Sequence, residues 1–360
     1  MKNKDITIFI GSLAGGGAER VACNLANFLF ESENNVTILT MSDIEDTYEV
    51  NSKIKRVYLL KKNERRNKIL DFFKRFKKLS KYMSNNKTDV YIVMLPITTI
   101  MMLLLRKKTD AKIIMSERVD PNSYNLVKKV LLKLLARRAD GYVFQTDDAK
   151  KWYNLKNEKS IVIPNAINEV FLKQTNQTVI RKKKIVSVGR LNKQKNFELL
   201  IKSFLNMDNK YSDYKLYIYG EGKEKNKLLN IIRKNNLEGR VLLPGYSKNI
   251  KEDIKDASLF VMSSNFEGMP NALIEAMALG LPCISTDCPC GGPKYLIKNN
   301  INGILVPVGN ENYMTKKIEF LLSNETISKK IGDNAKKVVD DLHPNKIYNT
   351  WLNFIYSVID

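Results

Sequence analysis

Two glutamates separated by a glycine and a proline are the residues of this chain best suited to contact a sugar. They are Glu267 and Glu275, in the segment NFEGMPNALIEA (265–276). The apolar run before them predicts a strand, Gly268 relaxes a turn, and Pro270 suits the first position of a helix, where its missing N–H costs nothing. We therefore expect Glu267 in the loop and Glu275 inside the helix, where both carboxylates can accept hydrogen bonds from hydroxyl groups.

The start of this helix is also suited to hold an anion. Its first backbone N–H groups, at Asn271 and Ala272, lack acceptors within the helix and lie at the positive end of the helix dipole. One segment thus offers groups for a phosphate and for a sugar, as a sugar nucleotide requires. The alternative interpretation is an amphipathic helix with surface acids, so a second motif has to agree.

A second motif places two cations at a strand-to-helix turn. In KKIVSVGRLNKQKNF (183–197) a β-branched run ends at Gly189, Arg190 follows, and Lys195 precedes a helix that begins near Asn196. A guanidinium can donate two hydrogen bonds to phosphate oxygens and an ammonium adds a compact charge, which together offset the roughly two negative charges of a departing diphosphate. Alone this turn would be an ordinary solvated surface, but with the acidic segment it indicates a diphosphate site.

A third element lies near the N-terminus, where a strand at 6–10 runs into the loop GSLAGGGAER (11–20) and a helix over 18–30. Gly16 and Gly17 let the backbone approach a ligand closely, and the helix start supplies free amides. The loop lacks the spacing of the GxGxxG dinucleotide motif, and the acid expected about twenty residues later is absent. NAD binding is therefore disfavoured.

Together these segments resemble those of retaining family-4 glycosyltransferases, which have the GT-B fold of two Rossmann-like domains. The likeness spans nearly the whole chain. It is carried by GGGAER (15–20), SERVDP (116–121), VIPNAI (162–167), VGRLNKQKN (188–196), YGEG (219–222), FEGMPNALIEA (266–276) and GLPCISTDCPCGGPKYLI (280–297). The resemblance implies an α/β fold with parallel sheets and an active site in the cleft between the two domains.

The resemblance also implies roles for single residues. Arg190 and Lys195 would hold the nucleotide diphosphate, Glu267 would contact and orient the donor sugar, and Glu275 would take the ribose hydroxyls. The leaving phosphate would itself take the acceptor proton, so that no separate general base is required. The donor-binding set comprises Gly16, Gly17, Arg190, Lys195, Glu267, Gly268, Asn271, Ala272 and Glu275.

One position departs from the family pattern. Many relatives carry a histidine after the strand that precedes the acceptor loop, whereas this chain has SERVDP there and its single histidine is His343. Glu117 or Arg118 takes that place. The candidate catalytic residues are therefore Arg190, Lys195, Glu267 and Glu117. A structural ion pair is the alternative role for both. The residues expected to shape the loop beside the diphosphate are Thr286, Gly291, Gly292 and Lys294.

The chain of 360 residues exceeds what one core usually supports, so two domains are expected. Strand patterns alternate with helical ones, which favours parallel sheets. Strands are predicted near 6–10, 36–40, 57–60, 89–94, 112–117, 141–146 and 160–163, and then at 184–189, 214–220, 241–246, 258–264, 282–287 and 303–307. The predicted division is an N-terminal domain at 1–170, a linker at 171–184, a C-terminal domain at 185–343 and a final helix at 344–360. In the resembled fold this helix crosses back to the first domain, and its buried face would comprise Trp351, Phe354 and Ile355.

No segment is predicted to cross a membrane. The most apolar run, 91–105, contains Pro96 and falls short of the roughly twenty residues that a spanning helix needs, so it is interpreted as a strand and a buried helix. The N-terminal apolar run is too short for a signal peptide, and four cysteines are too few for a disulfide framework. The protein is therefore expected in the cytoplasm.

Neither a metal nor an organic cofactor is predicted. No Asp-x-Asp pair occurs in the sequence, so the usual carboxylate arrangement for Mg²⁺ under a diphosphate is missing. Cys288 and Cys290 lack the further ligands that a tetrahedral metal site requires. Transfer independent of a metal ion is the prediction.

The net charge of +22 points to an anionic partner. The basic excess peaks from Lys53 to Lys87, where an amphipathic helix is predicted. Its apolar arc comprises Ile69, Phe72, Phe73, Phe76, Leu79 and Met83, and its basic arc Lys74, Arg75, Lys77, Lys78 and Lys81. A second basic helix at 124–138 sets Leu126, Val127, Val130, Leu131, Leu134 and Leu135 against Lys128, Lys129 and Lys133.

Two such helices in one domain suggest docking on an anionic membrane surface. The alternative is that each helix buries its apolar side and leaves an ordinary basic surface. Nucleic acid is disfavoured as the partner because the basic region contains no recognised reading module.

We therefore predict a cytoplasmic retaining glycosyltransferase, attached peripherally to the inner face of the cell membrane. It would move a hexose or N-acetylhexosamine from a UDP-sugar, which is a substrate and not a cofactor, to a lipid-linked saccharide acceptor. The setting in cell-envelope polysaccharide synthesis comes from the resemblance. Two alternatives stay open: a GT-B sugar-nucleotide epimerase, which would be expected to use several acid/base groups, and a non-catalytic basic scaffold at the membrane.

Overall fold

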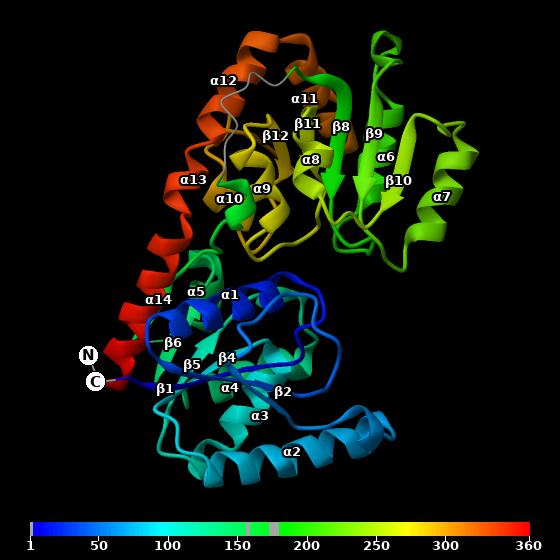
Figure 1. Ribbon diagram of the computed structural model, residues 1–360. Coiled ribbons are helices and arrows are strands. Elements are labelled where there is room, and N and C mark those ends of the chain that lie inside the picture. Colours follow the sequence, from blue (N-terminus) through cyan, green and yellow to red (C-terminus); the bar gives the residue numbers. More distant parts are fainter. Residues whose placement is uncertain (1–2, 156–158, 173–179) are drawn as a thin grey trace. The chain divides into compact units, whose positions relative to one another are not determined.

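The computed structural model describes residues 3–155, 159–172 and 180–360. The chain divides into two compact units (Figure 1): an N-terminal unit of Met1–Ala166 with Asn345–Asp360, and a C-terminal unit of Ile167–Pro344. Each unit is built on one parallel β-sheet with helices, so the prediction of two Rossmann-like α/β domains is confirmed.

The sheet of the N-terminal unit has seven strands in the order β3-β2-β1-β4-β5-β6-β7. Their bounds are β1 Asp5–Ile10, β2 Asn35–Thr40, β3 Lys55–Tyr58, β4 Val90–Met94, β5 Lys112–Ser116, β6 Gly141–Phe144 and β7 Ser160–Val162. The central strands β1 and β4 are almost entirely buried, as runs of Ile, Val and Phe are when helices cover both faces of a parallel sheet. Each lies within a few residues of a strand predicted from the sequence.

The helices of this unit are α1 Gly17–Glu31, α2 Lys68–Asn85, α3 Pro96–Leu104, α4 Leu126–Ala136, α5 Asp147–Tyr153 and, from its second residue on, α14 Pro344–Ile359. The apolar run 91–105 forms β4 and the largely buried α3, as predicted. The C-terminal helix packs on this unit (Figure 1), where the Tyr356 hydroxyl donates to Asn34 Oδ1 at 2.9 Å. Trp351 and Ile355 are fully buried, whereas Phe354 is half-buried.

The sheet of the C-terminal unit has six strands in the order β10-β9-β8-β11-β12-β13, in which the chain starts at the centre and winds outward in both directions. The strands are β8 Lys182–Val188, β9 Lys215–Tyr219, β10 Val241–Gly245, β11 Ala257–Met262, β12 Cys283–Thr286 and β13 Ile304–Val306. The helices are α6 Phe197–Leu205, α7 Lys225–Lys234, α8 Ile250–Ile254, α9 Asn271–Ala278, α10 Gly292–Leu296, α11 Glu311–Ser323, α12 Glu325–Ala335 and α13 Val338–Asp341. Strand order therefore reverses between β8 and β11, which in such sheets is where ligands bind.

The predicted linker at 171–184 extends too far. Residues 173–179 lie outside the described part of the chain, and Lys182 already begins β8. Lys184 belongs to the sheet because it pairs with Lys215 in the parallel register of β8 and β9. Its ammonium lies 5.0 Å from the ring centre of Tyr217 on β9 and 3.4 Å from Asp256. A run of lysines is polar in composition, but here their ion pairs make them compatible with a strand end.

The two basic helices of the N-terminal unit bury only part of their apolar sides. On α2, Leu79 and Met83 are buried, whereas Ile69 is 71% and Phe73 64% exposed. On α4, Leu126 is 76% and Leu134 67% exposed, while Val127 and Val130 are also exposed. Leu132, which the prediction had not placed on the apolar side, is buried with Leu135 instead. Helical periodicity alone did not distinguish the core-facing leucines from the outward-facing ones.

Candidate active site

Three loops of the C-terminal unit meet beyond the carboxyl ends of β8, β11 and β12. The backbone N–H of Asn265 donates to Gln194 O at 2.7 Å, and the Gln194 side chain donates to Phe266 O at 3.0 Å. The Thr286 hydroxyl donates to Ser264 O at 2.6 Å. These bonds join the loops at the point where strand order reverses, so the motifs at 183–197 and 265–276 form one site.

The two motifs are joined most directly by an ion pair. Lys195 Nζ lies 2.6 Å from Glu267 Oε1, and their side chains are 15% and 8% exposed. The Ser264 hydroxyl donates to the same carboxylate oxygen at 2.6 Å. Lys195 is therefore not a free cation, because its charge is already shared with the residue expected to orient the donor sugar.

The backbone of Glu267 is held on both sides. Its N–H donates to Pro289 O at 2.7 Å, and the N–H of Cys290 donates to Glu267 O at 2.8 Å. Gly292 lies against the same loop, since a Cβ there would come within 1.6 Å of Gly268 O. The expectation that Gly292 shapes this loop thus has a steric reason, and the Glu267 carboxylate has a well-defined position.

Arg190 differs from Lys195 in its surroundings. Its side chain is exposed, and it forms no hydrogen bond or ion pair with the residues that the structure describes. The turn that carries it is rigid, because the N–H of Leu191 donates to Glu221 O at 2.9 Å and Leu191 O accepts from Glu224 N at 3.0 Å. A guanidinium on a fixed backbone, with its donors uncommitted, is suited to bind an incoming anion.

Two further glycines, in the segment YGEG (219–222), support this turn. Gly220 has φ 138°, and a Cβ there would lie 2.0 Å from Gly189 O. At Gly222 a Cβ would lie 2.2 Å from Leu191 O. Any side chain at these positions would displace the backbone that carries Arg190, and the segment YGEG following a strand was the signal in the sequence.

Helix α9 begins at Asn271, so Pro270 is the residue before the helix and not its first residue as predicted. The prediction for the N–H groups of Asn271 and Ala272 is unaffected, because they still belong to the first turn, which has no acceptors within the helix. Glu275 lies within α9 and is buried, like Glu267. The helix thus carries one buried carboxylate, and the loop before it carries another.

In the N-terminal unit, the glycine loop leads into α1 as expected. Gly15 and Gly16 have φ of 58° and 139°, values that favour glycine, and α1 begins at Gly17. The carboxylate of Glu19 lies against Gly16, since a Cβ there would come within 2.2 Å of Glu19 Oε2. A protein carboxylate therefore lies where the sequence suggested the close approach of a ligand.

Glu117 follows β5 and is deeply buried. Its Oε1 accepts hydrogen bonds from the N–H groups of Arg118 and Val119 at 3.0 and 3.2 Å and from the Tyr124 hydroxyl at 2.7 Å, while Oε2 accepts from the Tyr153 hydroxyl. Burial raises the pKa of Glu117, and these hydrogen bonds act in the opposite direction. Because its acceptor positions are occupied, the carboxylate is placed to hold the loop that follows β5.

A structural ion pair was the alternative role for both Glu117 and Arg118, and neither residue forms one with the residues that the structure describes. Arg118 is 6% exposed, and none of its three guanidinium nitrogens has a hydrogen-bond partner among the described residues. The guanidinium instead lies over the ring of Trp351 at 5.5 Å, and burial lowers the pKa of Arg118 to about 10. The carboxylate of its neighbour is unavailable because backbone N–H groups and tyrosines already occupy it.

Among the described residues, no group of three or more His, Cys, Asp or Glu side chains is arranged to hold a metal ion. The four cysteines are all buried and free. Burial raises the pKa of Cys288 to about 12, so this thiol stays protonated near neutral pH.

Comparison with known proteins agrees with this geometry. Residues 15–170 match the model described as Glycosyltransferase Family 4, and residues 170–338 match Glycosyl transferases group 1. The chain is 31% identical over 349 residues, 91% of its length and 93% of the relative's, to the N-acetylgalactosamine-N,N'-diacetylbacillosaminyl-diphospho-undecaprenol 4-alpha-N-acetylgalactosaminyltransferase of Campylobacter jejuni. The chain belongs to the GT-B glycosyltransferases of the family-4 type.

Known structures show the same fold for the glycosyltransferase. Sucrose-phosphate synthase from Thermosynechococcus elongatus superposes with a TM-score of 0.85 at 16% identity, covering 99% of both chains. The Anabaena protein HepE in complex with UDP-glucose gives a TM-score of 0.82 at 15% identity, covering 99% of this chain and 100% of that one. At these identities the likeness concerns the fold alone.

Proposed function

We propose that this glycosyltransferase moves a hexose or N-acetylhexosamine from a UDP-sugar to a lipid-linked saccharide, with retention of anomeric configuration, in cell-envelope polysaccharide synthesis. The acceptor class is supported by the Campylobacter jejuni relative, whose name specifies a diphospho-undecaprenol substrate. The donor class is supported by HepE, a protein of the same fold that was determined with UDP-glucose. The observation that carries the proposal is the uncommitted Arg190 beside the Lys195–Glu267 pair at the switch point of the sheet.

In the proposed reaction the leaving group is a nucleoside diphosphate, whose negative charge grows as the glycosidic bond breaks. Arg190 and the N-terminal N–H groups of α9 stabilise that charge on the phosphate oxygens. Lys195 adds positive charge and at the same time fixes Glu267, which accepts hydrogen bonds from the donor sugar. The bond from the anomeric carbon to the diphosphate breaks, and the acceptor oxygen bonds to the anomeric carbon on the same face. The departing diphosphate oxygen takes the acceptor's proton, so the protein need supply no general base.

The test is a panel of nucleotide sugars incubated with the protein, with release of the free nucleotide followed by chromatography. Slow hydrolysis of a UDP-sugar is expected, with an α-linked sugar product from an α-linked donor when an acceptor is present, as read from the anomeric proton signal. Arg233→Ala, an exposed arginine on α7, is the matched control for Arg190→Ala. Inversion of the anomeric signal would refute retention, and hydrolysis that Arg190→Ala leaves intact would refute the site.

We also propose that the N-terminal unit docks on an anionic membrane surface on the cytoplasmic side. The apolar residues exposed on α2 and α4 are interleaved with lysines, which suits the interface between lipid headgroups and acyl chains. Among the described residues, no helix is both long and apolar enough to cross a bilayer. Peripheral binding through these two helices would bring the enzyme to a lipid-linked acceptor.

The basic residues proposed for this contact need one revision. Arg75 donates from Nε to Met41 O and from Nη2 to Ser42 Oγ, both at 3.0 Å, so it holds α2 to the unit. Lys78 pairs with Glu64 at 2.6 Å. Lys74 donates to Glu64 O at 3.5 Å, a long hydrogen bond. Of the five basic residues, Lys77 and Lys81 thus remain fully available for lipid headgroups, and the exposed leucines and valines of α4 become the stronger part of the proposal.

A further inference from the structure

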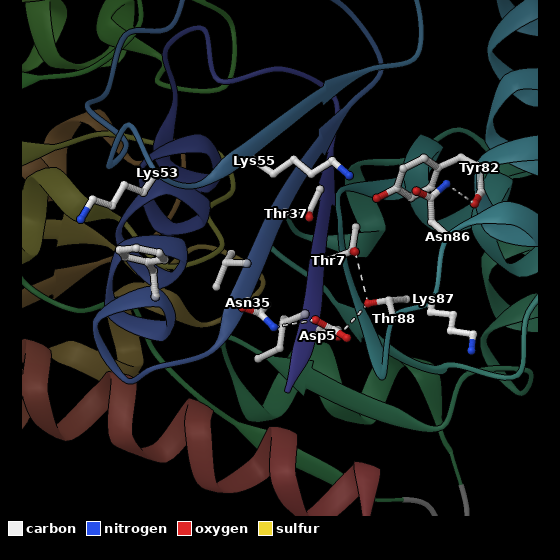
Figure 2. Close-up of a pocket in the computed structure, with 13 residues that line it drawn as sticks. Asp5, Thr7, Asn35, Thr37, Lys53, Lys55, Tyr82, Asn86, Lys87 and Thr88 are labelled. Atoms are coloured by element: carbon white, nitrogen blue, oxygen red, sulfur yellow. Dashed lines mark hydrogen bonds between the residues drawn. The ribbon is translucent and has the colours of Figure 1, made fainter. Parts of the chain in front are cut away.

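The N-terminal unit contains a cavity of about 320 Å³ at the amino ends of its strands. It is lined by the first residues of β1, β2 and β3, by the segment before β4 and by the last turn of α2 (Figure 2). In parallel α/β sheets the reacting ligands bind beyond the carboxyl ends of the strands. This cavity lies at the opposite edge of its own sheet, so it is a separate place from any site for the transfer reaction.

The lining carries an excess of positive charge, since it contains three lysines and one aspartate. Lys53, Lys55 and Lys87 are exposed and form no ion pair with the residues that the structure describes. The lining contains one carboxylate, that of Asp5, whose Oδ1 accepts a hydrogen bond from the Asn35 side chain at 3.0 Å. The lining thus combines three ammonium groups with one carboxylate, and this balance of charge suits an anionic ligand.

Hydroxyl groups form the other polar part of the cavity. Thr7 and Thr88 lie within 3.3 Å of each other through their hydroxyls, and Thr88 donates to Asp5 O at 2.7 Å. Burial raises the pKa of Tyr82, while the neighbouring Thr7 and Thr37 act in the opposite direction, and the phenol keeps its proton near neutral pH. Figure 2 shows Lys55, Thr37, Thr7 and Tyr82 around the same space, so the Lys55 ammonium shares the cavity with several neutral hydroxyl groups.

We propose that this cavity binds a phosphoglycerol group, with the phosphate on Lys55 and Lys87 and the glycerol hydroxyls on the threonine and tyrosine hydroxyls. Ammonium groups supply charge for a phosphate, and neutral hydroxyls both donate to and accept from a polyol. The volume of the cavity is near the lower limit for small-molecule sites, so a lipid headgroup fits it better than a nucleotide. The group can come from an anionic phospholipid or from a free glycerol phosphate, and only the lipid source rests on the membrane contact proposed above.

The test compares the wild-type protein with the Lys55→Gln/Lys87→Gln double variant, both saturated with UDP so that the reaction site is occupied. Binding of glycerol 3-phosphate is followed by saturation-transfer-difference NMR, with glycerol as the uncharged probe. Lys107→Gln/Lys108→Gln is the matched control, because it removes two exposed lysines of the same unit outside the cavity. We expect saturable binding of glycerol 3-phosphate that the cavity variant weakens about tenfold or more and the control leaves unchanged.

A second arm separates the two sources. Vesicles of phosphatidylglycerol and of phosphatidylcholine are sedimented with each protein, and loss of phosphatidylglycerol binding in the cavity variant alone indicates the lipid headgroup. Equal vesicle binding by both proteins, with glycerol 3-phosphate binding still lost, indicates the free phosphate. Binding that survives in the cavity variant, or that falls equally in the control, overturns the proposal. Hydrolysis of the UDP-sugar donor is measured for every variant. If the protein hydrolyses the donor but does not bind glycerol 3-phosphate, the cavity proposal fails while the proposed transfer reaction stands.

Discussion

Breaking the Lys195–Glu267 pair should destabilise the C-terminal unit far more than an ordinary surface ion pair would. Lys195→Met keeps the length of the side chain but leaves the buried Glu267 carboxylate, among the residues that the structure describes, with the Ser264 hydroxyl as its one hydrogen-bonding side chain. Removing one partner of a largely buried pair costs about 3–5 kcal/mol, because the other charge is left uncompensated. For a unit of this size that corresponds to a fall in Tm on the order of 10 °C.

The assay is differential scanning calorimetry of a double-mutant cycle with Lys195→Met, Glu267→Gln and both together. The double variant should recover about 2 kcal/mol relative to the sum of the single variants, because it removes both charges at once. Lys202→Met is the control, since its pair with Glu198 is much more exposed and should be worth less than about 1 kcal/mol. Single losses near that of the control, or losses that simply add, would refute the reasoning that these two residues form one buried unit.

Four other predictions follow from the same structure. Arg190→Ala should lower kcat/KM for the donor by about a hundredfold in steady-state kinetics, since an uncommitted guanidinium on a rigid turn is lost from the leaving group; a value near wild type would sink the assignment. EDTA should leave turnover unchanged, and a loss restored by Mg²⁺ or Mn²⁺ would contradict metal independence. Arg118→Met should keep or raise the Tm, because the buried guanidinium has no hydrogen-bond partner among the described residues and Met preserves its volume; a large drop would reveal a partner. Replacing the exposed α4 residues Leu126, Val130 and Leu134 by serine should weaken binding to anionic vesicles while sparing donor hydrolysis. Unchanged sedimentation with the vesicles would place the membrane contact elsewhere.

The sequence was sufficient for the strands and for the class of fold. Runs such as ITIFI and SLFVM are apolar without alternation, which happens when both faces of a strand are covered. Their alternation with helical segments required crossover connections and hence parallel sheets. The glycines and the proline around Arg190 and Glu267 marked turns for reasons local to the backbone.

The pairing of Lys195 with Glu267 could only be decided by the tertiary structure. The two residues are 72 positions apart, and they meet because β8 and β11 are neighbours although β9 and β10 come between them in the chain. Sequence spacing carries no information about strand order. For the same reason the isolation of Arg118 was missed, since the tyrosines that occupy Glu117 come from later segments.

What the sequence by itself determined was the local conformation and the type of chemistry each motif could support, because both depend on neighbours within a few residues. Only the tertiary structure decided which apolar sides are covered, and on α2 and α4 it left Ile69, Phe73, Leu126 and Leu134 exposed although their periodicity matches that of buried helices. It also built the amino-edge cavity from Thr7, Thr37, Lys55, Tyr82 and Thr88. Burial and cavities arise from packing between residues far apart in the chain, and a sequence pattern of period 3.6 or 2 contains no information about such contacts.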